Sequence, residues 1–160
     1  MPSSWLNNLR GSFLNMIRFP HLLPADCVLW QRFLDLHGGA FSRFEYDIRV
    51  GEGTDPGDQY ADNVRYDAIT LSQRRIDVVG YQANTITLFE VTTSAGLTAL
   101  GQLTAYPKLF SLTYSPGLPI IPHLVTYRFQ SDIEQIFIAQ GIQYTIIPSG
   151  QKPPVPEERT

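Results

Sequence analysis

Two apolar segments that follow one another in the chain each carry a single acidic residue at an interior position. They read RRIDVVGY over residues 74–81 and TITLFEVT over residues 85–92. Acidic residues are depleted in strands, and a carboxylate that leaves water is costly unless a cation or a proton accompanies it. The positions of Asp77 and Glu90 therefore need a common explanation.

The two segments are predicted to form a β-hairpin in which the acids face each other. If the hairpin closes symmetrically about Ala83 and Asn84, Asp77 lies opposite Glu90. Opposed residues of an antiparallel pair have Cβ atoms about 4.5–5.5 Å apart. Two carboxylates at that separation repel each other unless a cation or a shared proton lies between them. A bulge of one residue would instead move one acid to the other face of the sheet.

A hard cation is the ligand that such a pair of acids suits best. Mg²⁺ prefers oxygen ligands in octahedral geometry and retains several water molecules, so two carboxylates and one main-chain carbonyl can hold it. We expect these ligands to be Asp77, Glu90 and the carbonyl oxygen of Val91.

The composition argues against several other classes of site. The chain has 160 residues, which is long enough for one domain with a core. Its net charge is −3, which is not typical of a general polyanion binder. The single cysteine, Cys27, excludes an internal disulfide and is expected in the core. His21, His37 and His123 lack metal-ligand spacing and are expected on loops or at the surface. Without a membrane span or a secretory signal, a soluble cytoplasmic protein is expected.

Hydrophobic periodicity predicts a mixed α/β fold. The expected elements are helices at about 3–18 and 25–37, strands at about 41–50, 74–81 and 85–92, a helix at about 95–106, a strand at about 120–127, a helix at about 131–140 and a strand at about 142–148.

Turn-forming residues, proline and strand alternation indicate loops, helix ends and strand faces. Residues 51–63 are rich in turn formers and predict a surface loop. Pro107 is expected to kink or restart its helix. In the first strand, alternation predicts that four apolar residues share one side: Phe44, Tyr46, Ile48 and Val50.

The acid pair and the helix after it resemble a known superfamily. The pattern D-x12-E-x-T, followed by GQLTAY, is similar to the PD-(D/E)XK nucleases, in particular to small members from tailed phages. The resemblance covers about residues 25–148. It implies a mixed central sheet flanked by helices, with an αβββαβ core and here an extra N-terminal helix. It also implies that Asp77 and Glu90 bind Mg²⁺ and that Gln102 faces the site from the helix.

This likeness suggests a division of the chain and further site residues. Residues 1–24 would form an N-terminal helix or arm, residues 25–148 the nuclease-like domain and residues 149–160 an extended Pro-rich tail. Glu45 is a candidate for the additional acid that some relatives use. Arg74 and Arg75 are candidates for contacts to a DNA backbone, although an arginine pair beside a strand is as often a solvated edge.

Two expectations concern the helix after the acids. Leu103 and Tyr106 are expected to pack the helix against the sheet, and Gly96 and Gly101 to let the two approach closely.

Position 92 departs from the superfamily pattern. The usual lysine there positions the attacking water and stabilises developing negative charge, but this chain has Thr92. Losing one such contact typically costs on the order of 10²–10³ in rate. The two lysines of the chain are Lys108 and Lys152. Lys108 lies about 240° around a regular helix from Gln102, and Lys152 lies in the tail, so neither is well placed.

We therefore expect a nuclease fold with degenerate catalysis that serves as a structural component of a tailed-phage virion, for instance a head–tail connector, adaptor or neck protein. Its partners would be portal or tail subunits, further copies in a homo-oligomeric ring and possibly DNA, with no membrane. It would be made in the host cytoplasm and then enter the virion. The alternative is a Mg²⁺-dependent DNA endonuclease of the PD-(D/E)XK type. Mg²⁺ is the expected cofactor if the site is active, and otherwise none is expected.

Overall fold

The computed structural model describes residues 18–19 and 21–150. The expected N-terminal helix and the tail from residue 151 lie outside these residues, apart from Arg18. The helices are α2 (Pro24–His37), α3 (Asp62–Ser72), α4 (Leu97–Tyr114) and α5 (Ile133–Gln140), with a short 3-10 helix η1 (Gly38–Ala40). The strands are β1 (Arg43–Val50), β2 (Arg74–Tyr81), β3 (Ile86–Val91), β4 (Ser94–Ala95), β5 (Ile120–Thr126), β6 (Arg128–Phe129) and β7 (Gln143–Ile146).

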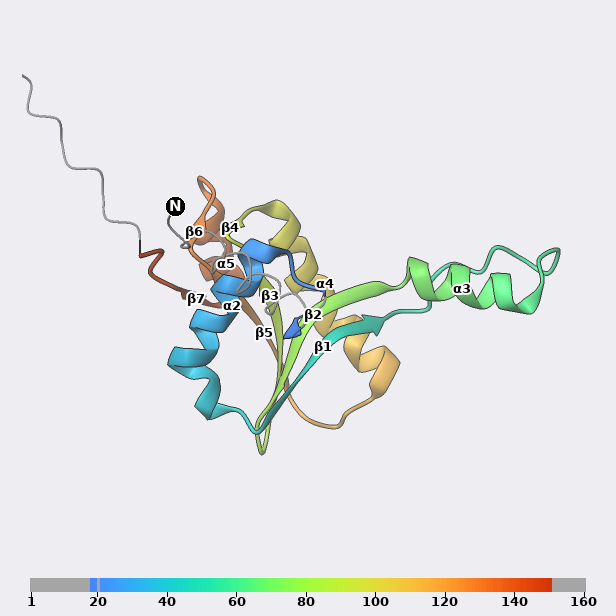
Figure 1. The fold of residues 1–160 in the computed structure, drawn as a ribbon, viewed down its shortest axis with the longest axis horizontal. Coiled ribbons are helices and arrows are strands. Elements are labelled where there is room, and N and C mark those ends of the chain that lie inside the picture. Colours follow the sequence, from blue (N-terminus) through green and yellow to red (C-terminus); the bar gives the residue numbers. More distant parts are fainter. Residues whose placement is uncertain (1–17, 20, 151–160) are drawn as a thin grey trace, which may run out of the picture.

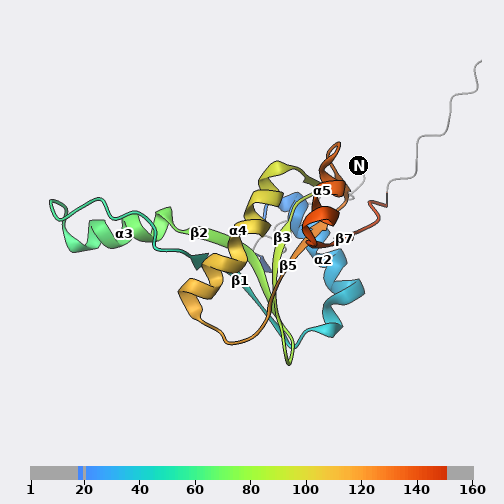
Figure 2. The same cartoon turned by 180° about the vertical axis from the view of Figure 1, so that it is seen from behind.

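A five-stranded mixed sheet forms the centre of the molecule, in the order β1-β2-β3-β5-β7. β2 is antiparallel to β1 and to β3, whereas β5 is parallel to β3 and to β7. Helix α2 packs on one face, and α4 and α5 pack on the other (Figure 1; Figure 2). Apart from α3, inserted between β1 and β2, and the short β4 before α4, the order α2-β1-β2-β3-α4-β5 is the αβββαβ order that the sequence led us to expect, so the predicted fold class is confirmed.

Alternation along β3 divides the core between the two faces. Phe89 is fully buried against α2, where its ring lies 5.1 Å from that of Trp30 between centroids. Leu88, its neighbour, points to the other face and joins the cluster of Tyr106 and Phe110 on α4. Cys27 is fully buried, as expected. An apolar strand with helices on both sides explains why β3 has no exposed residue.

The expectation that one side of β1 is apolar throughout is wrong. Phe44 and Tyr46 pack with the α2 cluster, whereas Ile48 and Val50 pack with the α4 cluster. Asp47, between them, has a φ of 57°, in the left-handed region. This residue twists the strand so that its two halves present opposite faces to the core.

Two helices also differ from the prediction. Helix α3 was not expected, because the turn-forming residues before it dominated that part of the sequence. It projects away from the body beyond the ends of β1 and β2 (Figure 1). Helix α4 runs through Pro107 and ends at Tyr114 instead of stopping near residue 106. Gly101 has nothing within 4 Å of an added Cβ, so it does not bring α4 closer to the sheet.

Within the described part of the chain, no helix is both long and apolar enough to span a bilayer.

Candidate functional site

The register of β2 and β3 brings the two acids of the hairpin opposite each other. Val78 pairs with Phe89 and Val79 with Leu88, so the next pair in this register is Asp77 and Glu90. The register predicted from the sequence is confirmed. The carboxyl groups lie close enough to share a proton.

Asp77 is held by the chain that follows Glu90. Its side chain is 13% exposed, and its Oδ2 accepts a hydrogen bond of 2.9 Å from the backbone N–H of Val91. Burial raises the pKa of Asp77 well above its ordinary value, although the bond from Val91 opposes that rise. Asp77 is thus fixed in place while its ionised form is disfavoured.

Glu90 is the more buried of the two acids, with 8% of its surface exposed. Burial raises its pKa, and the charge of Asp77 raises it further. Its Oε2 is buried and has no hydrogen-bond donor among the described residues. The adjacent carboxyl of Asp77 can satisfy Oε2 only through a shared proton, and a cation between the acids would satisfy both.

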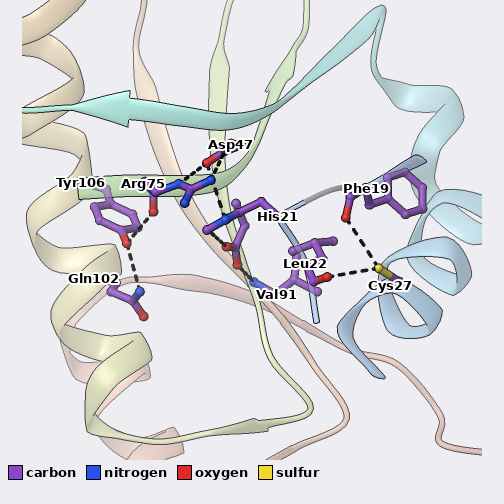
Figure 3. A network of polar contacts seen from close by, with 10 residues as sticks. Phe19, His21, Leu22, Cys27, Asp47, Arg75, Val91, Gln102 and Tyr106 are labelled. Atoms are coloured by element: carbon purple, nitrogen blue, oxygen red, sulfur yellow. Dashed lines mark hydrogen bonds and ion pairs between the residues drawn. The ribbon is translucent and has the colours of Figure 1, made fainter. Parts of the chain in front are cut away.

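Gln102 and Tyr106 connect Glu90 to helix α4. With its nitrogen toward the acid, the Gln102 amide donates to Glu90 Oε1 at 3.0 Å and to the carbonyl oxygen of Thr98 at 3.2 Å. In this orientation the amide oxygen accepts from the Tyr106 hydroxyl at 3.0 Å, and the same hydroxyl lies 2.9 Å from the carbonyl oxygen of Arg75 (Figure 3). Gln102 is therefore turned toward Glu90, and Tyr106 packs the helix on the sheet; both were expected.

Thr92 lines a cavity of about 410 Å³ together with Glu90 and Gln102. The cavity lies at the N-terminus of α4, and Ser94 and Gln130 complete its polar wall. No lysine belongs to its lining within the described residues. The position at which a lysine was expected therefore faces the acid, but it carries only a hydroxyl.

His21 lies in a turn, as expected for a loop histidine, but it also contacts the acids of the site, which the sequence did not lead us to expect. It lies in the turn before α2, and its Nε2 is 3.6 Å from Asp77 Oδ1 while its Nδ1 is 3.6 Å from Asp47 Oδ1. Figure 3 shows its ring beside Asp47 and Arg75. Burial lowers the pKa of His21, and Arg75 lowers it further, while Asp47 raises it. No local signal in the sequence indicates this contact, because it joins segments that are distant along the chain.

His123 was expected on a loop or at the surface, and this expectation is wrong. It lies on β5, and burial lowers its pKa to about 4. Its Nε2 lies 2.7 Å from Thr145 Oγ1, away from the acid pair.

Asp26 is a second residue that the sequence did not reveal. It lies in the first turn of α2, and burial raises its pKa while the nearby backbone of Thr93 opposes that rise. Its charge contributes to the raised pKa of both Asp77 and Glu90, so it lies near them. Glu45, the acid considered as an additional ligand, pairs with Arg43 and accepts from the Tyr81 hydroxyl.

The two arginines considered for DNA contacts have different environments. The guanidinium of Arg75 makes a two-point ion pair with Asp47. Arg74 is exposed. An additional phosphate contact by Arg75 would have to compete with Asp47, whereas Arg74 is accessible.

The donor set of the acid pair fits Mg²⁺. Two facing carboxyl groups with an orphaned buried oxygen offer the hard oxygen ligands that this ion prefers. Among the described residues, no group of three or more His, Cys, Asp or Glu side chains is arranged to hold a metal. A third protein ligand would therefore come from the main chain, and the carbonyl of Val91 is the expected donor.

No family model matches the chain, and no curated protein matches its sequence. Among solved structures, it is similar to one described as the structure of the EndoMS-dsDNA2 complex, with 13% identity and a TM-score of 0.45 over 78% of this chain and 45% of that one. It is also similar to a protein of unknown function, AF1548, with 14% identity and a TM-score of 0.39 over 72% of this chain and 56% of that one. The chain spans about half the length of either protein. Likeness at this level says nothing about activity, so the site is interpreted from its own geometry.

Proposed function

We propose that this chain is a nuclease-type protein that binds Mg²⁺ between Asp77 and Glu90 and that cleaves DNA poorly or not at all. The observation that carries the proposal is the buried Glu90 Oε2, which has no donor among the described residues and lies beside a second carboxyl. A buried carboxyl oxygen without a donor is costly, and a cation bound between the two acids would remove that cost.

Some residues of the site would bind the ion, and others would keep those ligands in position. Asp77 and Glu90 would ligate the ion, and Mg²⁺ so bound would act as a Lewis acid toward a phosphodiester oxygen. The Val91 N–H keeps Asp77 in position, and the Gln102 amide keeps Glu90 Oε1 in position. Oxygen Oε2 of Glu90 remains free for the ion.

Thr92 is the reason for proposing weak cleavage. A lysine at this position would bring a positive charge to the cavity beside Glu90, where negative charge develops during phosphodiester hydrolysis. A threonine hydroxyl is neutral and short, and no lysine replaces it in the lining of that cavity within the described residues. Cation binding can thus persist while hydrolysis is lost.

A structural role in a tailed-phage virion is the second candidate. It rests on the sequence resemblance and on Thr92, and the projecting helix α3 supports a role in docking to other subunits. Portal or tail subunits would be the partners in that case, and the protein would pass from the host cytoplasm into the particle.

A plasmid-cleavage assay with Mg²⁺ tests the proposed function. Wild type is expected to nick supercoiled DNA no faster than Asp77→Asn and Glu90→Gln, which serve as matched controls because they preserve shape. Robust Mg²⁺-dependent nicking by wild type, lost in both variants, would show that the site is fully active and that the weak-cleavage proposal is wrong.

A further inference from the structure

Residues 51–73 form an arm that projects from the body of the molecule. The arm consists of helix α3 and the loop before it, and it lies at one end of the long axis (Figure 1; Figure 2). None of the residues of α3 is buried. An isolated helix of this length is marginal in water, because most helical stability in proteins comes from packing one face against a neighbour. The arm is therefore a surface that a partner would complete.

The arm is held in one shape by its own polar contacts. Arg65 Nε donates to Asp55 Oδ1 at 3.0 Å, which ties the loop to the helix. The backbone N–H of Thr54 donates to Ser72 Oγ at 2.6 Å, which ties the loop to the end of α3. Since the loop occupies one face of α3, the opposite face is left outward in a preorganised shape. Docking of that face would cost little conformational freedom.

The outward face of the arm combines apolar side chains with an acid. Val64, Asp67 and Leu71 follow one another at helical spacing, and Tyr66 lies about 100° around the helix from Asp67. Tyr66 is 70% exposed and Leu71 is 74% exposed. The arm carries five acidic residues and one arginine, a net charge of −4. Asp55, Asp58 and Asp62 pair with Arg65, whereas Asp67 has no ion-pair partner within the described residues.

A groove at the other end of the molecule carries positive charge and an aromatic ring, which complement the acidic and apolar side chains of the arm. It has a volume of about 420 Å³, lies between α2 and β6, and is lined by Arg32, Thr93, Tyr127, Arg128 and Ser149. The Arg32 guanidinium lies 5.6 Å from the centre of the Tyr127 ring, and its Nη1 donates to the Ser149 carbonyl at 2.9 Å. Neither arginine has a carboxylate partner in the part of the chain that the structure describes. The groove therefore offers two positive charges beside an aromatic ring.

We propose that the arm of one copy docks in the groove of a second copy, with Asp67 facing Arg32 and Arg128 and with Leu71, on the same stripe of α3, against Tyr127. The arm and the region of α2 and β6 that holds the groove lie at opposite ends of the folded molecule, so the contact forms between copies and not within one (Figure 1). Single exposed apolar residues are ordinary. Helix α3, by contrast, is held in one shape, has no buried residue and carries an acid among exposed apolar side chains, and this combination favours docking to a partner. A head-to-tail contact of this kind closes into a ring or continues as a filament.

Sedimentation velocity of the full chain across a concentration series tests the proposal. Wild type is expected to self-associate, and association is expected to weaken as salt is added. Asp67→Arg and Arg128→Glu should each weaken association at least about tenfold, since each places like charges in contact. The double variant with both substitutions should associate more strongly than either single variant, because positions 67 and 128 then attract each other again, although Arg32 keeps its charge. Glu52→Arg, with the same charge change on the arm but outside its outward face, should behave as wild type.

Three results would overturn the proposal. One is a wild-type chain that stays monomeric at the highest concentration at which it remains in solution. Another is association of Asp67→Arg or Arg128→Glu at wild-type strength. The third is a double variant that associates no better than the single ones. Circular dichroism of each variant establishes that it is folded, so that a loss of association reports on the contact.

Discussion

At the scale of single residues, burial determines how Asp77 and Glu90 respond to pH. Burial is the largest cause of the raised pKa of each acid, and the mutual charge of the pair adds to it. The folded protein therefore retains protons that the unfolded chain releases. Stability of the metal-free protein is full below the ordinary carboxyl pKa, near 4, and declines as pH rises through the raised values of about 7 for Asp77 and about 9 for Glu90.

Asp77→Asn tests this pH dependence. The amide cannot ionise but can still accept the hydrogen bond from Val91, so the decline in stability with rising pH should become shallower. At a pH of about 8.5 without metal, the variant should exceed wild type by about 1 kcal/mol or more in free energy of unfolding. Urea denaturation at about pH 5 and about pH 8.5 measures the difference. An identical pH slope in the two proteins would contradict the assignment of the pair.

Thr92→Lys tests the reason given for weak cleavage. The lysine would restore a positive charge beside Glu90, so Mg²⁺-dependent nicking of plasmid DNA should rise by about 10²–10³ over wild type. The same substitution combined with Asp77→Asn should remain inactive, since one ligand is then lost. If Thr92→Lys cleaves no faster than wild type, the missing charge is not what limits the site.

The local sequence was enough to predict that the two acids face each other, but not which residues surround them. The short turn and the alternation of β2 and β3 were sufficient to predict that Asp77 faces Glu90. His21 and Asp26 reach the site only because α2 packs on the sheet, and no pattern in their own segment indicates this. Asp47 likewise adopts its left-handed conformation where its carboxylate pairs with Arg75, a contact made through the tertiary fold.

At the scale of elements, glycines distinguish a crowded strand from an open helix surface. A Cβ added to Gly80 of β2 would lie 2.9 Å from ring atoms of Phe41 and Phe89, whereas one added to Gly101 of α4 would meet nothing within 4 Å. The sequence predicted both elements but could not show which glycine was crowded, because that depends on aromatic rings from other segments.

Alanine at these two positions should therefore have opposite effects on stability. Gly80→Ala should destabilise by about 1–3 kcal/mol, because two rings must move. Gly101→Ala should stabilise by about 0.5–1 kcal/mol, because it raises helix propensity at an open position. Chemical denaturation of both variants measures the two changes. Destabilisation by Gly101→Ala would show that α4 is more tightly packed there than the structure indicates.

At the scale of the whole molecule, the site is assembled from segments that are far apart in the sequence. His21 comes from the turn before α2, Asp26 from α2 itself, the acid pair from the β2–β3 hairpin and Gln102 from α4. A ligand that bridges the pair binds only the folded chain, so Mg²⁺ should stabilise the whole domain by RT ln(1 + c/Kd), where c is the concentration of free Mg²⁺.

Calorimetric titration of Mg²⁺ into the full chain, in two buffers of different ionisation enthalpy, tests the central claim most directly. Wild type is predicted to bind one ion near Asp77 and Glu90 and to release protons as it does so, because both carboxyl groups hold protons more strongly than usual. Affinity should rise with pH, and Glu90→Gln should lose both binding and proton release. Absence of binding to wild type, or equal binding by wild type and Glu90→Gln, would contradict the account.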